Sequence, residues 1–193
     1  MKTQSIALAI ACAVTFAFVP SCATTPSHHA ASARSSAGQI ARDSRSALHS
    51  LYAQNPGARA LGKRARAVLV FPSIVKGGFV IGAEGGNGAM FRNGEITGYY
   101  QTVAASYGLQ AGVQEFGYAL FLMDDQAYRN FLRSDGWEIG GSPSVVVVDM
   151  GMATSLSTTT ARRGTYAFFF DQRGLMGGLS LQGTKVTRIH PGR

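Results

Sequence analysis

The sequence predicts an α+β domain, namely a strongly curved, glycine-rich antiparallel β-sheet or partial barrel with N-terminal helices and one inserted helix. Three observations lead to this prediction. Of the 24 glycines, 21 fall at or beyond Gly77, short β-branched or aromatic runs lie between them, and apolar residues recur at helical spacing before them. Glycines inside strands usually mark bulges or sharp coiling, which a small curved sheet requires.

The helical part begins near Gly38, where apolar residues recur with a period of three to four as far as Gln54. This pattern predicts an amphipathic helix with a basic stripe. Its apolar face either packs on the domain or enters a bilayer. Asn55-Pro56-Gly57 breaks the helix, and a short second helix is expected over Ala58–Arg64. The inserted helix is expected over Asp124–Arg133, with Asp124 as its cap.

Strands are expected in the glycine-rich part of the chain, with Asn93-Gly94 as a two-residue hairpin turn. Their predicted ranges are Ala67–Phe71, Gly78–Ala83, Gly88–Arg92, Glu95–Tyr100, Ser106–Gln114, Gly117–Leu122, Val145–Asp149, Ala153–Thr159, Gly164–Phe170 and Gly177–Arg188. Because successive strand residues point to opposite faces, Phe168 and Phe170 should share one face and Phe169 should lie on the other.

The first 21 residues have the layout of an export signal: Lys2, an apolar stretch and then Val19-Pro20-Ser21-Cys22. These last four residues resemble the bacterial lipobox, although Pro20 departs from the usual small residue. The resemblance implies that Cys22 is acylated and becomes the first mature residue. A plain secretory signal with a different cleavage site is the alternative. The expected domains are therefore a signal peptide (1–21), a flexible tether (22–37) and a folded domain (38–193).

The cysteines agree with an anchor. Cys12 lies in the removed segment, so the mature chain keeps only Cys22, which has no intramolecular disulfide partner. Ala23 follows it, and lipoproteins without Asp at that position usually reach the outer membrane. We therefore expect a chain that is lipid-anchored, with palmitate among its modifications, at the periplasmic face of the outer membrane.

Positive charge is concentrated near the N-terminus. Residues 22–70 hold seven basic side chains and one acid, Asp43, whereas residues 71–193 hold ten basic and nine acidic side chains. A basic segment beside a lipid anchor is attracted to anionic head groups. We expect no nucleic-acid partner, because the expected export and the lack of a recognisable nucleic-acid-binding motif both argue against one.

Several glycine-rich blocks resemble the SYLF domain family. They are Ala65–Pro72, Lys76–Gly88, Gly108–Gly112, the helix around Phe131 and Gly174–Gly183, and the likeness runs from about Ala41 to Ile189. Members of this family bind membrane lipids, notably phosphoinositides in eukaryotes, and some bind actin. The resemblance implies a lipid-binding module rather than an enzyme, with membrane phospholipids as partners and anionic head groups favoured.

The resemblance also implies where lipid binds. Family lipid binding is attributed to the N-terminal basic and amphipathic portion, and Lys76 is placed at a strand entrance where it could meet a phosphate. The candidate lipid-binding residues are Arg42, Arg45, Arg59, Lys63, Arg64, Arg66 and Lys76. If Ala58–Arg66 is helical, then Arg59, Lys63 and Arg66 share one face. The alternative is a solvated basic face that only maintains solubility.

Catalytic and metal chemistry finds little support. Gly57–Arg64 nearly spells a P-loop, but Arg64 replaces the magnesium-binding hydroxyl. Ser73–Lys76 matches S-x-x-K without its partner motifs, and Ala104–Gly108 resembles a nucleophile elbow without a well-placed histidine. No metal-binding spacing occurs, so no cofactor is expected. The remaining alternatives are a structural or protein-interaction lipoprotein of the envelope and, third, a small periplasmic hydrolase.

Overall fold

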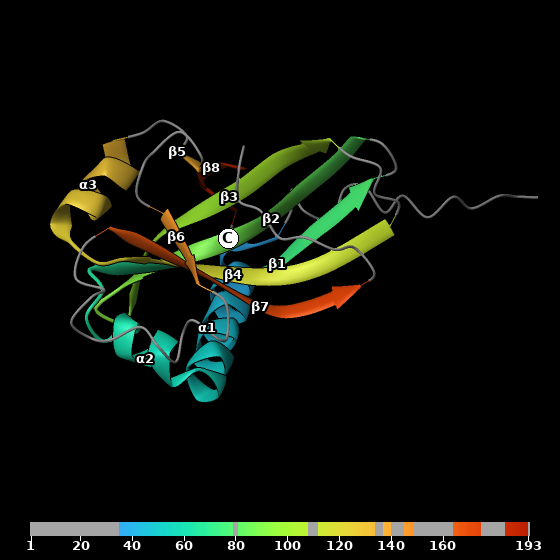
Figure 1. The fold of residues 1–193 in the computed structure, drawn as a ribbon. Coiled ribbons are helices and arrows are strands. Elements are labelled where there is room, and N and C mark those ends of the chain that lie inside the picture. The colour runs from blue at the N-terminus through green and yellow to red at the C-terminus, as the bar shows by residue number, and fades with distance from the viewer. Residues whose placement is uncertain are drawn as a thin grey trace, which may run out of the picture.

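The computed structural model of the chain describes residues 35–78, 81–107, 112–133, 137–139, 145–148, 164–174 and 184–192 (Figure 1). The expected signal peptide, most of the expected tether, Cys22 and the expected strand Ala153–Thr159 lie outside these residues. Three helices are described: α1 (Ala37–Gln54), α2 (Pro56–Gly62) and α3 (Asp125–Arg133).

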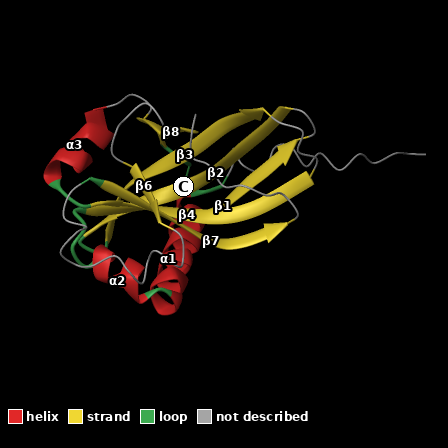
Figure 2. Ribbon diagram, in the orientation of Figure 1, coloured by secondary structure: helices red, strands yellow, loops and turns green. Residues whose placement is uncertain are grey.

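Eight described strands form one sheet in the order β5-β8-β3-β2-β1-β4-β7-β6 (Figure 2). Their bounds are β1 Ala67–Gly78, β2 Ile81–Arg92, β3 Glu95–Tyr107, β4 Gly112–Leu122, β5 Trp137–Ile139, β6 Val145–Val148, β7 Thr165–Gly174 and β8 Thr184–Ile189. The α+β class and the curved sheet are confirmed. The described strands form an open sheet, with β5 and β6 at its two ends.

The sheet is mixed rather than purely antiparallel, which corrects the prediction. Every described pair is antiparallel except β6–β7, where Val145 lies opposite Thr165 and Val148 opposite Phe168 in parallel register. A parallel pair needs a connection of about a dozen residues or more, and residues 149–164 are long enough to supply it. The sequence pattern of four valines fixed a strand but not its direction.

The sheet has two faces, and each is covered by its own hydrophobic core. One face, the helix-pair face, packs Val70, Phe121 and Phe168 against Ile40 and Leu51 of α1 and residues of α2. The other face, the α3 face, collects Leu69, Phe71, Phe116 and Tyr118 beneath Phe131 of α3. In Figure 1, α1 and α2 lie on one side of the sheet and α3 lies at the end where β1 begins.

Three consecutive phenylalanines in β7 test the prediction that successive strand residues point to opposite faces of the sheet. Phe168 and Phe170 belong to the helix-pair face and Phe169 belongs to the α3 face, as predicted. Since the side chains of Phe168 and Phe169 are both buried, both faces of β7 are covered at this point.

The helix boundaries follow from side-chain capping. Ser36 accepts a hydrogen bond from the Gln39 amide at the start of α1. Asn55 ends α1 and its Oδ1 accepts from the Ala58 amide at 2.9 Å, so one residue separates the two helices, as the Asn-Pro-Gly motif predicts. The predicted cap of α3 is also confirmed, because the Ala127 amide donates to Asp124 Oδ1 at 2.7 Å.

Two glycine positions show why β1–β3 fold as they do. Asn93 and Gly94 both have positive φ, at 53° and 83°, which the tight β2–β3 hairpin requires. A Cβ on Gly88 would collide with the Val70 carbonyl oxygen and the Phe71 ring. Only glycine therefore lets β2 approach β1 at this point, where the β1–β2 register also shifts between Val70 and Val75.

Candidate membrane-binding surface

The outer side of α1 carries the first two predicted basic residues. Arg42 and Arg45 are both exposed, and with Ser46, His49 and Ser50 they line a shallow groove of ≈ 420 Å³. The Arg45 guanidinium lies 5.9 Å from the centre of the Phe91 ring, which holds it against β2. Arg42 Nη2 donates to Gln39 Oε1 at 2.6 Å. The two exposed guanidinium groups let this groove bind anions.

The next basic residues surround α2. Arg59, Lys63 and Arg64 are exposed, and Arg59 Nε donates to the Tyr52 carbonyl oxygen at 2.9 Å. The helix ends at Gly62, so the expectation that Arg59, Lys63 and Arg66 share a helix face is wrong for Arg66. Lys63 and Arg64 form the turn after the helix, and Arg66 lies just before β1. The Arg66 amide instead donates to the Leu122 carbonyl oxygen at 2.8 Å, which begins the β1–β4 ladder.

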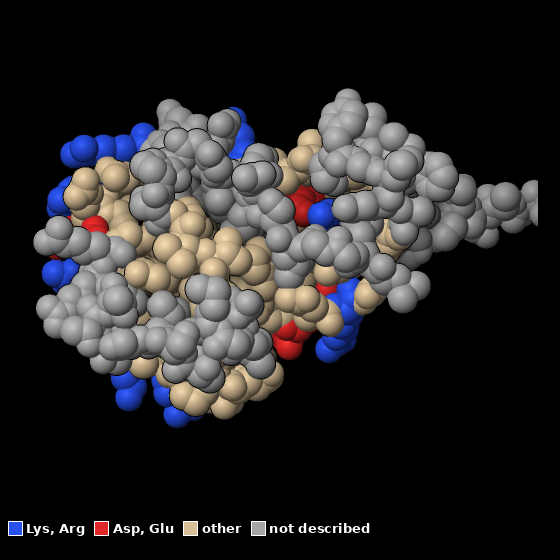
Figure 3. Space-filling view, viewed as in Figure 1, with Lys and Arg blue, Asp and Glu red and all other residues tan. Residues whose placement is uncertain are grey.

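Strand register brings sequence-distant basic residues to the same end of the sheet. Ala67 pairs with Leu122, Leu122 with Thr165, and Arg92 with Glu95, so β1, β3 and β7 begin where β2 and β4 end. The exposed basic residues of this end, called the basic end below, are Arg59, Lys63, Arg64, Arg66, Arg92, Arg129 and Arg133. Figure 3 shows Lys and Arg atoms along the margin of the molecule beside α2 and α3.

Sequence reasoning missed the last three of these residues. Arg129 and Arg133 are four residues apart in a correctly predicted helix, so their common side could have been found from the spacing. Arg92 could not, because its neighbourhood depends on the position of α3: its guanidinium lies 5.0 Å from the centre of the Tyr128 ring. The periodicity of a sequence predicts which residues share one face of a helix or strand. It does not predict which helices and strands contact one another.

Lys76 lies elsewhere and in a different environment. It is near the end of β1 rather than at a strand entrance, and it is buried at 6% relative exposure. Its Nζ lies 3.9 Å from Oε2 of Glu84, its direct partner on β2. Burial raises the pKa of the Glu84 carboxyl above its ordinary value, and the Lys76 charge only partly offsets this. The structure therefore does not bring Lys76 together with the other candidate residues.

The residues around Lys76 form one polar row across the α3 face. Register aligns Thr184 of β8, Ala104 of β3, Glu84, Lys76 and Gln114 of β4. The four polar members are buried, and Gln114 Oε1 and Thr184 Oγ1 have no hydrogen-bond partner among the described residues. The hydrophobic core of this face ends at this row.

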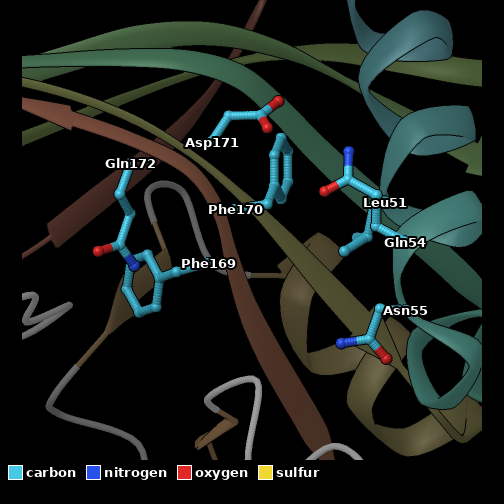
Figure 4. Close-up of a pocket in the computed structure, with 7 residues that line it drawn as sticks. All are labelled: Leu51, Gln54, Asn55, Phe169, Phe170, Asp171 and Gln172. Atoms are coloured by element: carbon cyan, nitrogen blue, oxygen red, sulfur yellow. The ribbon is translucent and has the colours of Figure 1, made fainter.

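Two cavities lie beside α1. The first, of ≈ 310 Å³, is lined by Leu51, Gln54, Asn55, Phe169, Phe170, Asp171 and Gln172. In Figure 4, Phe170 points toward α1 whereas Phe169 lies on the other side of the β7 ribbon. The second, of ≈ 590 Å³, lies at the start of α1, where Val75 and Val103 are 53% and 45% exposed. Both combine apolar walls with polar rims.

The motifs dismissed on sequence grounds can be checked where they are described. Gly57–Arg64 is α2 and the turn after it, not a phosphate-binding loop between a strand and a helix. Ser73 Oγ donates to Glu115 Oε1 at 2.7 Å, while Lys76 pairs with Glu84, so the two S-x-x-K residues have separate partners. Among the described residues, no group of three His, Cys, Asp or Glu side chains is placed to hold a metal ion.

Across the part of the chain that the structure describes, no helix has the length and apolar character needed to span a bilayer.

Comparison with known proteins supplies one positive result. Residues 103–190 match the family model described as Ysc84: Las17-binding protein actin regulator, which represents the SYLF domain. No curated protein matches the chain. The matched segment runs from within β3 to just beyond β8 and includes α3, so this part of the chain is similar to the SYLF domain family.

Proposed function

We propose that this protein is a non-catalytic, lipid-anchored module that binds anionic phospholipids at the periplasmic face of the outer membrane. The observation that carries the proposal is the exposure of Arg42, Arg45, Arg59, Lys63 and Arg64 on α1, α2 and the turn after α2. Asp43 is the sole acid of residues 22–70, so little negative charge in that segment offsets them. The SYLF assignment supports a lipid- or actin-binding role in general.

Electrostatics give the expected contribution of the exposed basic residues to the free energy of membrane binding. Each Lys or Arg close to an anionic surface contributes about 1 kcal/mol to binding, and exposed charges are screened over about 10 Å at 0.1 M salt. Arg66 contributes less, because its Nε lies 3.2 Å from Asp125 Oδ1. The exposed charges of Arg42, Arg45, Arg59 and Lys63 are therefore enough for salt-sensitive membrane association without a deep lipid pocket.

The anchor and the basic surface act together in this proposal. Acylation of Cys22 would hold the chain at the membrane, and the basic residues would hold the domain against the head groups. Mass spectrometry of the membrane-extracted protein tests the first part. An unmodified Cys22 would remove the anchor from the proposal while leaving the head-group interaction open to its own test.

Vesicle cosedimentation tests the second part. The full chain carrying Cys22→Ser should bind vesicles that contain phosphatidylglycerol more strongly than vesicles of phosphatidylcholine alone, and the difference should shrink as salt rises. Reversing Arg42, Arg45, Arg59, Lys63 and Arg66 to Glu should abolish the difference. A circular-dichroism melt is the control, because exposed substitutions usually change the free energy of unfolding by less than about 0.5 kcal/mol each.

Unaltered vesicle binding by the folded five-site variant would mean that these side chains are only a solvated face. Binding that does not change with salt would instead point to an apolar lipid site, and the cavities beside Phe170 and beside Val103 are the places to search. Variants there should then alter binding while the basic variants do not.

A second candidate function is protein binding at a sheet edge. The edge strand β6 exposes Val146 at 42% and Val147 at 44%, and an edge strand can pair with an added strand. The matched family is described as an actin regulator that binds another protein, Las17. Loss of a partner in Val147→Lys, with vesicle binding unchanged, would favour this candidate over lipid binding.

A further inference from the structure

We propose that α3 and the β2–β3 hairpin form a second half of the membrane-binding surface, in which Arg129 and Arg133 bind lipid phosphates and Leu132 inserts between head groups. This inference rests on the proposed function and extends it to the β2–β3 hairpin and to α3, which begins more than sixty residues after α2 ends. The partner is the surface of a bilayer that contains anionic phospholipid.

The exposed side of α3 has the composition that such a surface needs. Arg129, Leu132 and Arg133 recur at i, i+3 and i+4, which places them together on one side of the helix. All three are exposed, and Leu132 is 46% exposed although α3 buries Phe131 on its other side. An apolar side chain flanked by two arginines is typical of a helix at a membrane interface, because arginine heads reach phosphates while the apolar group enters the acyl boundary.

Contacts with other elements make this side continuous with the N-terminal basic residues. Asp125, four residues before Arg129 on α3, holds Arg66 through the 3.2 Å ion pair. On the neighbouring side of the helix, Arg92 covers the Tyr128 ring at 5.0 Å. Arg66, just before β1, and Arg92 of β2 therefore meet α3 at the basic end and hold it in place from two directions.

The charge balance favours a lipid surface over a merely solvated end. The basic end gathers seven basic side chains, while the acids of this end among the described residues are Glu95, Asp124 and Asp125. Asp124 is occupied in local structure, since its Oδ1 accepts from the Ala127 amide and its Oδ2 from the Gly164 amide at 2.9 Å. Asp125 is engaged by Arg66. Arg129 and Arg133 therefore face solvent with little local compensation.

The decisive experiment compares two double variants that change the net charge equally. In the Cys22→Ser full chain, Arg129→Glu/Arg133→Glu reverses the α3 pair. Arg173→Glu/Lys185→Glu reverses two exposed residues in the far half of the sheet, opposite Glu115 and Val103. The α3 variant should bind phosphatidylglycerol vesicles at least about 25-fold more weakly, from about fivefold per arginine, and the far variant should change binding much less.

Leu132 provides an independent measurement. Leu132→Ser should weaken vesicle binding even at high salt, because the lost contribution is apolar and is not screened. Leu132→Trp should restore binding, and its emission should shift to the blue when vesicles are added. Trp emission that stays unshifted, or binding that Leu132→Ser leaves intact, would overturn the insertion of this side chain.

The outcomes separate this inference from the proposed function. If the N-terminal charge reversal abolishes vesicle binding and Arg129→Glu/Arg133→Glu leaves it unchanged, then the proposed function stands and this inference fails. If both double variants weaken binding equally, only net charge matters and the inference also fails. If the parent chain does not bind anionic vesicles at all, the proposed function itself fails; an acidic protein that is captured instead, in an Arg129-dependent manner, would overturn the lipid assignment.

Discussion

Two ion pairs between described residues lie in opposite halves of the sheet. Arg66–Asp125 joins the basic end to α3 at 3.2 Å, with side chains 56% and 49% exposed. Lys76–Glu84 joins β1 to β2 at 3.9 Å, with both side chains 7% exposed. The first pair is shorter, yet water screens it and keeps its energy small. The Lys76–Glu84 pair is longer than a hydrogen bond, but both side chains are buried. Removing either charge alone would leave the other buried without a partner, which is strongly destabilising.

The comparison shows that basic residues have two different roles in this domain. At the basic end, arginines remain accessible and can exchange protein partners for phosphate. In the far half of the sheet, Lys76 compensates Glu84 within a buried polar row. A count of positive charges along the chain treats both kinds alike, so only the exposed kind should respond to membranes and only the buried kind should control stability.

Removing Lys76 should give the largest effect on stability. Lys76→Met leaves Glu84 buried without its cation, which should lower the free energy of unfolding by about 3 kcal/mol at neutral pH. Urea denaturation measures this. The loss should shrink in acid, where Glu84 is protonated in both states. In the double variant Lys76→Met/Glu84→Leu, most of the stability should return, and a double variant as unstable as the single would show that the pair is not the cause.

The same variant sharpens the functional half of the comparison. Lys76→Met, if it is assayed while folded, should bind anionic vesicles as the parent chain does, because its side chain is buried. Arg59→Glu/Lys63→Glu should do the reverse, with weaker vesicle binding and an unchanged melt. Weaker binding by folded Lys76→Met would return Lys76 to the lipid-binding residues.

A change of pH should have a smaller effect on the free energy of unfolding than the loss of Lys76. Burial raises the pKa of Glu84 from its ordinary 4.5, so the folded protein keeps this proton at pH values where the unfolded chain has released it. The contribution of Glu84 should therefore fall as pH rises from about 4.5 through the raised pKa, and should then stay constant. The difference in unfolding free energy between the parent chain and Glu84→Gln, followed across pH, should show this slope.

The exposed pair should give the smallest change. Asp125→Ala should cost less than about 1 kcal/mol of stability, because exposed ion pairs contribute little. It should also release Arg66 from its carboxylate and strengthen binding to anionic vesicles slightly. Asp43→Ala is the matched control, since it removes an exposed acid from α1 whose two carboxylate oxygens accept hydrogen bonds from Gln39 Nε2. Weaker vesicle binding by Asp125→Ala would mean that the bridge positions α3 for binding.

Local signals predicted most of the elements but not all of their ends. Asn55-Pro56-Gly57 separated α1 from α2 and Asp124 capped α3, because capping depends on residues a few positions apart. Strands β1 and β2 are longer than predicted, since glycines such as Gly85 and Gly86 continue β2 through what looked like a break. The second helix was predicted over Ala58–Arg64 and ends at Gly62, so the helical condition under which Arg66 would share its face is not met, and the Arg66 amide instead begins the β1–β4 ladder.

The sequence by itself determined the α+β class, the alternation of Phe168, Phe169 and Phe170 between the two faces of β7, and the basic character of the N-terminal segment. Strand alternation, helical period and charge are local properties of the chain. Tertiary structure alone decided that β6 runs parallel to β7, that Lys76 is buried opposite Glu84, and that Arg92, Arg129 and Arg133 join the α2 residues at one end. The physical reason is that burial and charge pairing depend on cross-strand register and helix docking. These relate residues that are far apart in the chain, and no local pattern records them.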